Sequence, residues 1–324
     1  MKITIVIPVY NGETYIQGAL DSCLLQTYRE IEILIVNDGS TDSTLSIIEE
    51  YELQDSRINH IYQSNQGLVR ARKTGVENVK TDFFVFLDSD DKLTPNAIQN
   101  LVENYNETKA DIIFSNFTIE LENGKILASS NNKFYNSYES ISVLNNILQK
   151  NIAPTIWGKL VKRELFQKID TPDDITIGED AVSIVQLLCL NPSISSIDSN
   201  IYRYIQRSNS MVNINDKKKN FKRIYLISYL KDYVLQHFKS SDSIENSLKC
   251  FLLLECFDVL RDGGVFSDIS NCYKWCTSTK SIYAYKRVLG LSRVFMLVFF
   301  SRNYTIGMLY RRLYNFIRKM KYSL

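Results

Sequence analysis

An acidic cluster in the first third of the chain, Asp88-Ser89-Asp90-Asp91, has residues that could bind a metal ion. Mg²⁺ and Mn²⁺ prefer oxygen ligands and often bind one or two carboxylates together with phosphate oxygens. A nucleotide diphosphate is densely negative, so a cation between it and these carboxylates would remove their repulsion. The same cluster also suits a solvated turn before a helix that starts near Thr94-Pro95, with proline at the first helical position. Taken alone, the cluster leaves both interpretations open.

Two further motifs carry residues suited to a nucleotide. Asn37-Asp38-Gly39-Ser40 follows an apolar run, and Asp38 could accept hydrogen bonds from a base or a ribose. Arg70 and Arg72 follow Asn65-Gln66-Gly67 at the start of an expected helix, whose positive N-terminal end suits phosphate or a polarised base. Helix capping at the first motif and a solvated basic turn at the second explain the same residues without a ligand.

The elements that would position these residues alternate over the first 120 residues. Short apolar runs, expected to be strands, are separated by helical patterns of about 12 to 15 residues. The expected strands are Ile3–Pro8, Ile31–Val36, Ile58–Tyr62, Phe83–Leu87 and Asp111–Phe117. This alternation predicts an α/β fold with a mostly parallel sheet and helices on both faces.

Polar residues follow three of these strands, in Tyr10-Asn11-Gly12, Asn37-Asp38-Gly39-Ser40 and Asp88-Ser89-Asp90-Asp91. In open parallel sheets, ligands bind beyond the carboxyl ends of the strands. Three polar strand ends therefore indicate a single ligand site. As a member of this series, the acidic cluster is a stronger metal candidate than it is alone.

The second part of the chain has a mostly helical pattern. Gly178-Glu179-Asp180 opens one expected helix, and Ile194–Tyr204 is one more expected strand. Only helices are expected after it. We therefore predict a first domain over residues 1–215 and a helical C-terminal region over residues 216–324.

Taken together, the motifs resemble those of glycosyltransferase family 2. The resemblance rests on Pro8-Val9-Tyr10-Asn11, Asn37-Asp38-Gly39-Ser40, Asn65-Gln66-Gly67 leading to Arg72, and Asp88-Ser89-Asp90, in this order and about 25 residues apart. Gln26-Thr27-Tyr28 matches as well, and the likeness covers roughly residues 1–210. It implies the GT-A fold, with a Rossmann-like nucleotide-binding half, and a sugar transfer that inverts the anomeric carbon.

The resemblance also assigns roles to single residues. Pro8, Tyr10 and Asp38 match positions around the nucleotide base, Arg72 lines the same pocket, and Asp88 matches the carboxylate nearest the ribose. The residues that it implies for the nucleotide sugar are Pro8, Tyr10, Glu13, Asp38, Arg72, Asp88, Ser89, Trp157, Arg207 and Ser210.

A metal ion and a catalytic base complete what the resemblance implies. Asp90, together with Asp88, matches the ligand of Mn²⁺ or Mg²⁺, and Asp91 is an additional acid beside them. Trp157-Gly158-Lys159-Leu160 followed by Gly178-Glu179-Asp180 resembles the acceptor side of the family, which implies Asp180 as the base and Glu179 as the alternative. Inversion requires one carboxylate to take the proton of the acceptor hydroxyl. Adjacent acids at a helix start are otherwise common capping residues.

Arginines also follow the last expected strand, where Arg203, Arg207 and Ser210 lie. This segment is similar to the mobile Arg-x-x-Ser segment that closes on the donor diphosphate in the family. A cation there would stabilise the leaving group. A surface turn is the alternative interpretation.

The net charge of +2 conceals a basic C-terminal end. Residues 269–324 hold eleven Lys and Arg and no acidic residue, whereas the other 268 residues hold 27 basic and 36 acidic residues, a net of −9. On a helix with about 100° per residue, apolar residues share one face and basic residues the other. The apolar set is Ile306, Leu309, Tyr310, Leu313, Ile317 and Met320, and the basic set is Arg311, Arg312, Arg318 and Lys319.

Such a helix favours an anionic membrane surface, where each basic side chain contributes roughly 1 kcal/mol. A helix packed on its own domain is the alternative. The longest apolar run, Val294 to Phe300, is far shorter than the about 20 residues that span a bilayer. Cys272 and Cys276 fit buried thiols in a reducing compartment better than a zinc site. We expect no nucleic-acid partner, because no RNA-binding or helix-turn-helix motif occurs.

The resemblance, together with the basic tail, implies a metal-dependent, inverting hexosyl- or N-acetylhexosaminyl-transferase. It would move a sugar from a UDP-sugar to a hydroxyl of a lipid-linked glycan, in the synthesis of a bacterial surface polysaccharide such as a capsule. We expect it in the cytoplasm, peripheral on the inner face of the plasma membrane, with a possible homodimer through the helical region. There are two alternatives, a nucleotidyltransferase and a non-catalytic nucleotide-sugar-binding protein. The sequence argues against the first, because no glycine-rich, lysine-containing loop follows the first strand.

Overall fold

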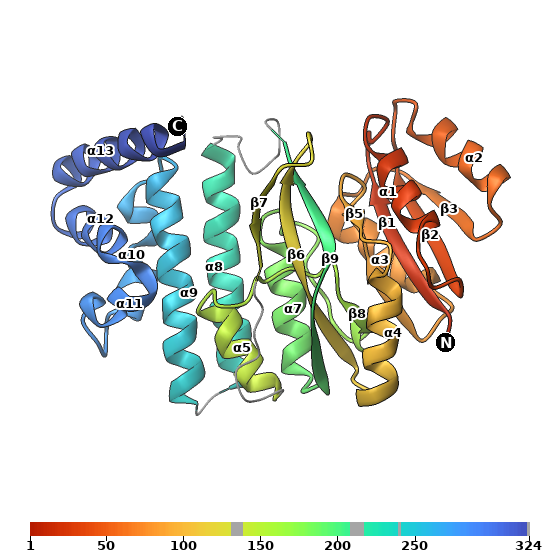
Figure 1. Cartoon of the computed structure of the whole chain (residues 1–324). Coiled ribbons are helices and arrows are strands. Elements are labelled where there is room, and N and C mark those ends of the chain that lie inside the picture. Colours follow the sequence, from red (N-terminus) through yellow and green to blue (C-terminus); the bar gives the residue numbers. More distant parts are fainter. Residues whose placement is uncertain (131–138, 208–216, 239–240, 323–324) are drawn as a thin grey trace. The chain divides into compact units, whose positions relative to one another are not determined.

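The computed structural model describes residues 1–130, 139–207, 217–238 and 241–322. The chain forms two compact units, one of Met1–Val143 and Ile152–Asn213, the other of Leu144–Asn151 and Ile214–Leu324. All described strands lie in the first unit, and the second is helical (Figure 1). The second unit thus includes a short segment before residue 152 that the sequence pattern assigned to the first domain.

The N-terminal half of the sheet is parallel, in the order β3-β2-β1-β4. Its strands are β1 (Ile3–Val9), β2 (Ile31–Asp38), β3 (Ile58–Gln63) and β4 (Phe83–Phe86), each within two residues of its expected ends. All seven residues of β1 are buried, which explains why all but Thr4 are apolar. The helices between these strands are α1 (Ile16–Leu24), α2 (Thr44–Gln54) and α3 (Leu68–Asn78).

The rest of the sheet is mixed, so the prediction of a mostly parallel sheet holds only for the N-terminal half. Strand β8 (Leu160–Lys162) runs antiparallel to β4 and to β6 (Ile112–Leu121), and β9 (Ile194–Gln206) runs parallel to β6. Strand β5 (Lys92–Leu93) pairs antiparallel with β9, and β7 (Ile126–Ser129) pairs antiparallel with β6. Strands this short show no hydrophobic period, so the sequence did not reveal them. Helices α4 (Ala97–Thr108), α6 (Arg163–Phe166) and α7 (Glu179–Cys189) belong to this half.

Helix α4 begins after Pro95, and not at it as the sequence suggested. The buried Gln26 side chain fixes this start: its Nε2 donates to the carbonyl of Thr94 (2.7 Å) and its Oε1 accepts the N–H of Ile98 (3.0 Å). Gln26 thereby satisfies an N–H of the first turn that has no partner within the helix. The Gln-Thr-Tyr motif is thus a structural tie between the first and fourth helices.

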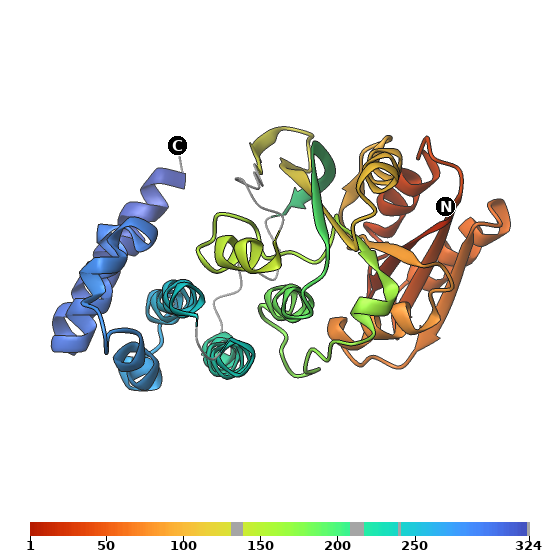
Figure 2. The same cartoon turned by 90° about the horizontal axis from the view of Figure 1, so that it is seen from below.

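The second unit is built around α9, which is buried along most of its length. Helix α8 runs beside it, and Figure 2 looks along both axes. The unit consists of the second half of α5 (Ser140–Leu148), α8 (Lys217–His237), α9 (Asp242–Arg261), α10 (Phe266–Cys276), the 3₁₀ helix η2 (Ile282–Tyr285), α11 (Lys286–Leu289), α12 (Leu291–Arg302) and α13 (Tyr304–Tyr322). All six cysteines of the chain are free thiols. Within the described residues, no helix has the length and apolarity needed to cross a bilayer.

Helix α13 turns its apolar stripe outward. The exposed residues of this stripe are Ile306, Leu309, Leu313, Phe316 and Ile317, at 48–62% of their full exposure. The opposite side packs on the same unit, where Arg311 donates to the carbonyl of Leu260 (3.2 Å) and the ring of Tyr314 meets that of Phe257. Most of the predicted apolar face therefore does not pack on its own domain, although Tyr310 meets the ring of Phe299. The side chains of Arg318, Lys319 and Met320 lie outside the described residues. The prediction that Arg311 lies on a solvated face is wrong, because its guanidinium binds backbone carbonyls of the unit.

Close packing of α3 on the sheet depends on Gly75. A Cβ at this position would lie 2.5 Å from Val6 Cγ1 and 3.3 Å from Val36 Cγ2, on two buried strands. We expect Gly75→Ala to lower the free energy of unfolding by about 1–3 kcal/mol, because overpacking a core forces backbone shifts. Urea unfolding measures the loss, and Val6→Ala in the same chain should recover part of it.

The matched control is Gly18→Ala in α1, where a Cβ would meet only the flexible end of Lys92. Alanine favours a helix over glycine by roughly 1 kcal/mol, so this variant should be neutral or more stable. Equal losses in both variants would contradict the packing argument.

Candidate active site

The loops after β1 and β2 are joined by side-chain ties. Asn11 accepts the N–H of Thr41 (2.8 Å), and its own N–H donates to Ser40 Oγ (2.9 Å). Glu13, expected at the nucleotide sugar, accepts the N–H of Ser43 (2.9 Å). Glu13 thus holds two strand-end loops together, and a contact with a ligand stays a prediction.

The residues predicted around the base lie at these same strand ends. Pro8 is buried within β1, opposite Val36, whereas Tyr10 beyond the strand is 51% exposed. The loops after β1 and β4 approach closely, since a Cβ on Gly12 would lie 3.8 Å from Ser89 Oγ. Tyr10 is therefore available to stack on a ligand, while Pro8 shapes the strand end.

Asp38 is buried at the end of β2 and organises the loop before α3. Its carboxylate accepts hydrogen bonds from Gln63 Nε2 (2.7 Å), the N–H of Gln66 (2.9 Å) and the N–H of Gly67 (2.8 Å). A carboxylate has about four acceptor positions, so a base N–H can still bind. Asp38 thus fixes the start of the helix that carries Arg72.

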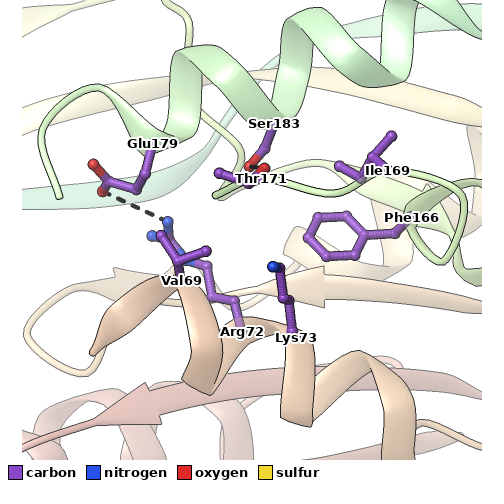
Figure 3. A pocket seen from close by; sticks show the side chains of 8 residues that line it. All are labelled: Val69, Arg72, Lys73, Phe166, Ile169, Thr171, Glu179 and Ser183. Atoms are coloured by element: carbon purple, nitrogen blue, oxygen red, sulfur yellow. Dashed lines mark hydrogen bonds and ion pairs between the residues drawn. The ribbon is translucent and has the colours of Figure 1, made fainter. Parts of the chain in front are cut away.

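Arg72 is the centre of the candidate site. Its guanidinium is buried and binds Asp88 Oδ1 through Nη2 (2.9 Å) and Asp180 Oδ1 through Nη1 (2.6 Å), with Glu179 Oε1 at 3.7 Å from Nη1. Figure 3 shows the contact with Glu179. The sequence placed Arg72 near the helix N-terminus and in the nucleotide pocket. It lies on the second turn of α3 and joins the acidic cluster to the proposed base, and its place in a nucleotide pocket stays a prediction.

Three carboxylates share this one guanidinium, and the pKa values of two of them, Asp88 and Glu179, are raised. Burial raises the pKa of Asp88 to about 6, with Arg72 opposing the rise and Asp180 and Asp90 adding to it. Burial, followed by the charge of Asp180, raises the pKa of Glu179 to about 7. The excess negative charge near Arg72 therefore suits a ligand that brings a cation.

A small pocket lies beside Arg72, lined by Val69, Arg72, Lys73, Phe166, Ile169, Thr171, Glu179 and Ser183 (Figure 3). Its cavity volume of about 10 Å³ is enough for one water molecule and far too small for a sugar. Arg72 Nε is buried and has no hydrogen-bond partner among the described residues. This pocket is therefore part of the support of Arg72 and not the donor site.

Asp90 is the carboxylate best placed to meet a cation, because its side chain is 49% exposed. In this structure that cation is Arg207, whose Nη1 lies 2.7 Å from Asp90 Oδ2. The Arg207 guanidinium also stacks on the ring of Tyr15, 3.8 Å from its centre. Ser210, the other predicted residue of this segment, lies outside the described residues.

The donor set at Asp90 and Asp88 fits a hard divalent cation. No group of three or more His, Cys, Asp and Glu side chains among the described residues could hold a metal by itself. Mg²⁺ commonly takes one or two carboxylates and completes its coordination with phosphate oxygens and water. The exposed oxygen of Asp90, already paired with a cation, suits this role.

Asp91 and Tyr202 fix the acidic cluster to β9. Asp91 is buried; it accepts a hydrogen bond from the hydroxyl of Tyr202 (2.7 Å) and another from the N–H of Ile205 (2.8 Å). The same hydroxyl accepts the N–H of Asp88 (3.2 Å). Burial raises the pKa of Asp91 well above its usual value, with Asp90 and Asp88 adding to the rise. Asp91 therefore sets the shape of the cluster.

Trp157 completes the support of this cluster. It is buried and stacks on Tyr202, with ring centres 4.1 Å apart. The sequence predicted that Trp157 contacts the nucleotide sugar, and this stays a prediction. Tyr15 and Tyr202, which support Arg207 and Asp91, were not predicted, because a single tyrosine in an amphipathic or strand pattern gives no signal.

Asp180 and Glu179 stand in the first turn of α7, after Gly178, whose φ is +76°. Asp180 Oδ2 accepts the N–H of Ile156 (3.3 Å), while its Oδ1 binds Arg72. Carboxylates are favoured at a helix N-terminus by the helix dipole. The fold thus brings Arg72, Asp88, Asp180 and Glu179 into one cluster, with Asp90 and Arg207 as a second pair. Arg203 lies outside both, paired with Glu120 on the sheet (2.7 Å).

The sequence profile described as "Glycosyl transferase family 2" matches residues 4–170, just over half of the chain. The chain belongs to glycosyl transferase family 2. This confirms the resemblance seen in the motifs.

Several curated relatives are similar. "Glycosyltransferase GlyA" of Streptococcus pneumoniae is 34% identical over 65% of this chain and 31% of its own length. "Uncharacterized glycosyltransferase EpsJ" of Bacillus subtilis is 29% identical over 65% of this chain and 63% of its length. The match thus spans about a third of the first relative and just under two thirds of the second. "Glycosyltransferase GlyG" of S. pneumoniae is 27% identical over 81% of this chain and 98% of its length.

Solved structures support the fold. S. aureus TarS 1-349 in complex with UDP-GlcNAc aligns with a TM-score of 0.66 and 20% identity over 98% of this chain and 92% of its own. Mannosyltransferase PcManGT from Pyrobaculum calidifontis, in complex with GDP-Man and Mn²⁺, aligns with a TM-score of 0.52 and 14% identity over 97% and 87%. These likenesses confirm the GT-A fold with a helical C-terminal region.

Glu179→Gln tests the electrostatics around Arg72. A carboxyl group with a raised pKa in the folded state stabilises the fold at low pH, and this contribution is lost as the pH rises through about 7. We expect the variant to match the wild type at roughly pH 4 and to exceed it by about 1–3 kcal/mol at roughly pH 8. Urea unfolding at both pH values measures the difference.

Glu164→Gln is the matched control, because Glu164 is exposed on the surface and its pKa is lowered by Lys168. This control should not gain stability between the two pH values. If Glu179→Gln has the same effect at both, Glu179 does not have a raised pKa.

Proposed function

We propose that this protein transfers a sugar from a UDP-sugar to a hydroxyl of a glycan, with inversion at the anomeric carbon. The observation that carries the proposal is Arg72, which joins Asp88 at the end of β4 to Asp180 at the start of α7. One carboxylate belongs to the expected diphosphate side and the other to the expected acceptor side. A single buried cation thus fixes the spacing between donor and base.

The donor side is proposed at the ends of β1, β2 and β4. Exposed Tyr10 is suited to stack on the base, and the remaining acceptor position of Asp38 can take a base N–H. The choice of UDP is supported by the fold neighbour that binds UDP-GlcNAc. The hexosyl or N-acetylhexosaminyl group is set by the shape of the pocket, since small changes there alter sugar choice.

Asp90, with Asp88, would hold Mn²⁺ or Mg²⁺, which when bound neutralises charge on the diphosphate. A fold neighbour in complex with GDP-Man and Mn²⁺ supports a metal of this kind. Arg207 would leave Asp90 for the diphosphate as the donor enters, because the exchange keeps the guanidinium paired with anionic oxygens. Tyr15 would keep the planar group stacked in either position.

Asp180 is proposed as the base. It would take the proton of the acceptor hydroxyl as that oxygen attacks the anomeric carbon and the bond to the diphosphate breaks on the opposite face. Arg72 and the N–H of Ile156 each bind one of its oxygens. Both contacts hold the carboxylate in one orientation. Glu179, farther from Arg72, is the weaker candidate.

Asp180→Asn and Asp90→Ala test these assignments. With Mn²⁺, a panel of UDP-sugars and a hydroxyl acceptor, we expect Asp180→Asn to lower kcat about 10²–10⁴-fold with little change in UDP binding. Asp90→Ala should remove the increase in UDP release that Mn²⁺ causes in the wild type. UDP release and the anomeric configuration of the product are measured.

Asp174→Asn, an exposed aspartate six residues before Asp180, is the control and should retain full activity. Release of pyrophosphate would favour a nucleotidyltransferase. If the wild type neither releases UDP nor binds UDP in the presence of Mn²⁺, the transferase assignment is wrong. UDP-sugar binding without turnover would instead indicate a binding protein.

We also propose that α13 attaches the protein to the anionic inner face of a membrane, where a lipid-linked glycan would be the acceptor. Exposed apolar residues on α13 and the absence of any acidic residue from 269 to 324 support this placement. A lipid surface fits this face better than a second copy, because two copies would bring like charges together. A role in surface-polysaccharide synthesis follows from this acceptor.

Replacing Leu309, Leu313 and Phe316 by glutamine tests the membrane surface. We expect the triple variant to lose flotation with vesicles that contain anionic lipid, because both apolar insertion and helix orientation depend on these side chains. Leu53→Gln, on a leucine that is 90% exposed in the first unit, is the control and should float as the wild type does.

Two results together would contradict the membrane proposal: the wild type does not float, and it forms a dimer in solution that the triple variant disrupts. The stripe would then be a protein interface between two copies.

A further inference from the structure

Lys159 is a buried lysine whose ammonium group is shielded from solvent and makes no ion pair among the described residues. Its side chain is fully buried, and no carboxylate of the described residues lies within ion-pair distance of Nζ. Its Nζ donates to Thr155 Oγ1 (2.8 Å) and lies 4.9 Å from the centre of the Phe114 ring. Burying an amine this way is costly, so it needs a reason beyond packing.

The loop that precedes Lys159 leads directly to the proposed base. Thr155, held by Lys159, is followed by Ile156, whose N–H donates to Asp180 Oδ2 (3.3 Å). At the other end of the loop, the Gly158 carbonyl accepts a hydrogen bond from Ser115 Oγ (2.5 Å). Lys159 therefore fixes the one part of the loop that touches Asp180.

The charge of Lys159 also acts on Asp180. Burial lowers the pKa of Lys159 to about 7, and the Asp180 carboxylate partly opposes that fall. Below about pH 7, then, Asp180 is near two cations: Lys159, and Arg72 from α3. The negative groups that share this region are Glu179 on α7 and Asp88 after β4. A cation favours the ionised form of a neighbouring carboxylate.

We propose that Lys159 is a positioning residue for Asp180: it holds the Thr155–Ile156 backbone against this carboxylate and places a positive charge near it. This proposal rests on the proposed role of Asp180 as the base. It explains why the Trp157-Gly158-Lys159-Leu160 motif places a lysine among buried apolar side chains.

Three variants separate the hydrogen bond from the charge. Lys159→Gln can still donate to Thr155 but carries no charge, Lys159→Met has neither property, and Thr155→Val keeps the charge without the acceptor. The measurements are the pH profile of kcat/KM for UDP-sugar transfer, UDP binding and Tm.

We expect Lys159→Gln to move the acidic limb of kcat/KM upward by about one pH unit, a tenfold loss on that limb, because the proposed base then loses a neighbouring positive charge. Thr155→Val should lower kcat without moving the limb. Lys159→Met should raise Tm, since it removes a buried polar group, while lowering kcat. UDP binding should stay unchanged in all three.

A purely structural role predicts the opposite: Lys159→Met would lower Tm, and the acidic limb would stay in place in every variant. Either result overturns the proposal. The proposed function is tested separately by the wild type. If the wild type transfers sugar and Lys159→Gln keeps an unchanged pH profile, only the role of Lys159 is wrong.

Discussion

The ion-pair cluster around Arg72 is the interaction on which the site depends. One guanidinium, held in a buried position on α3, binds a carboxylate at the end of β4 and another at the start of α7. These segments are separated by about a third of the chain, and the described site shows no other direct link of comparable strength between them. Breaking a buried ion pair leaves an uncompensated charge, which is strongly destabilising. The cluster therefore holds both halves of the site in one geometry.

The electrostatic balance of this cluster is incomplete without a ligand. Asp88, Glu179 and Asp180 bring three acidic groups to one guanidinium, and burial raises the pKa of the first two to about 6 and about 7. Such groups give up protons readily when a cation approaches. This excess of acidic groups suits the metal ion that we propose at Asp90 and Asp88, because a cation relieves the repulsion between neighbouring carboxylates.

Sequence alone predicted the framework of this site and not its connections. Apolar runs and the polar residues after them located β1, β2 and β4, because burial on both faces leaves a clear pattern. The half-exposed β3 was located by its place between two helical patterns. The link between Arg72 and Asp180 crosses 108 positions and depends on how α3 and α7 pack, which no local pattern encodes. Helix α13 shows the same limit. The helical repeat of the sequence correctly placed Leu309 and Arg311 on opposite faces, but it did not indicate which of these faces packs on the second unit.

Two arginines with different partners divide the work that we propose for the site. Arg72 is buried, its neighbours cannot move apart without exposing charge, and Asp38 fixes the start of its helix. Arg207 is held by an exposed carboxylate and by the face of Tyr15, contacts that water and other anions can replace. An enzyme that binds a charged donor and releases a charged product needs both kinds of cation. In the proposed reaction, the fixed arginine would preserve the distance between donor and base, and the exchangeable one would follow the diphosphate in and out.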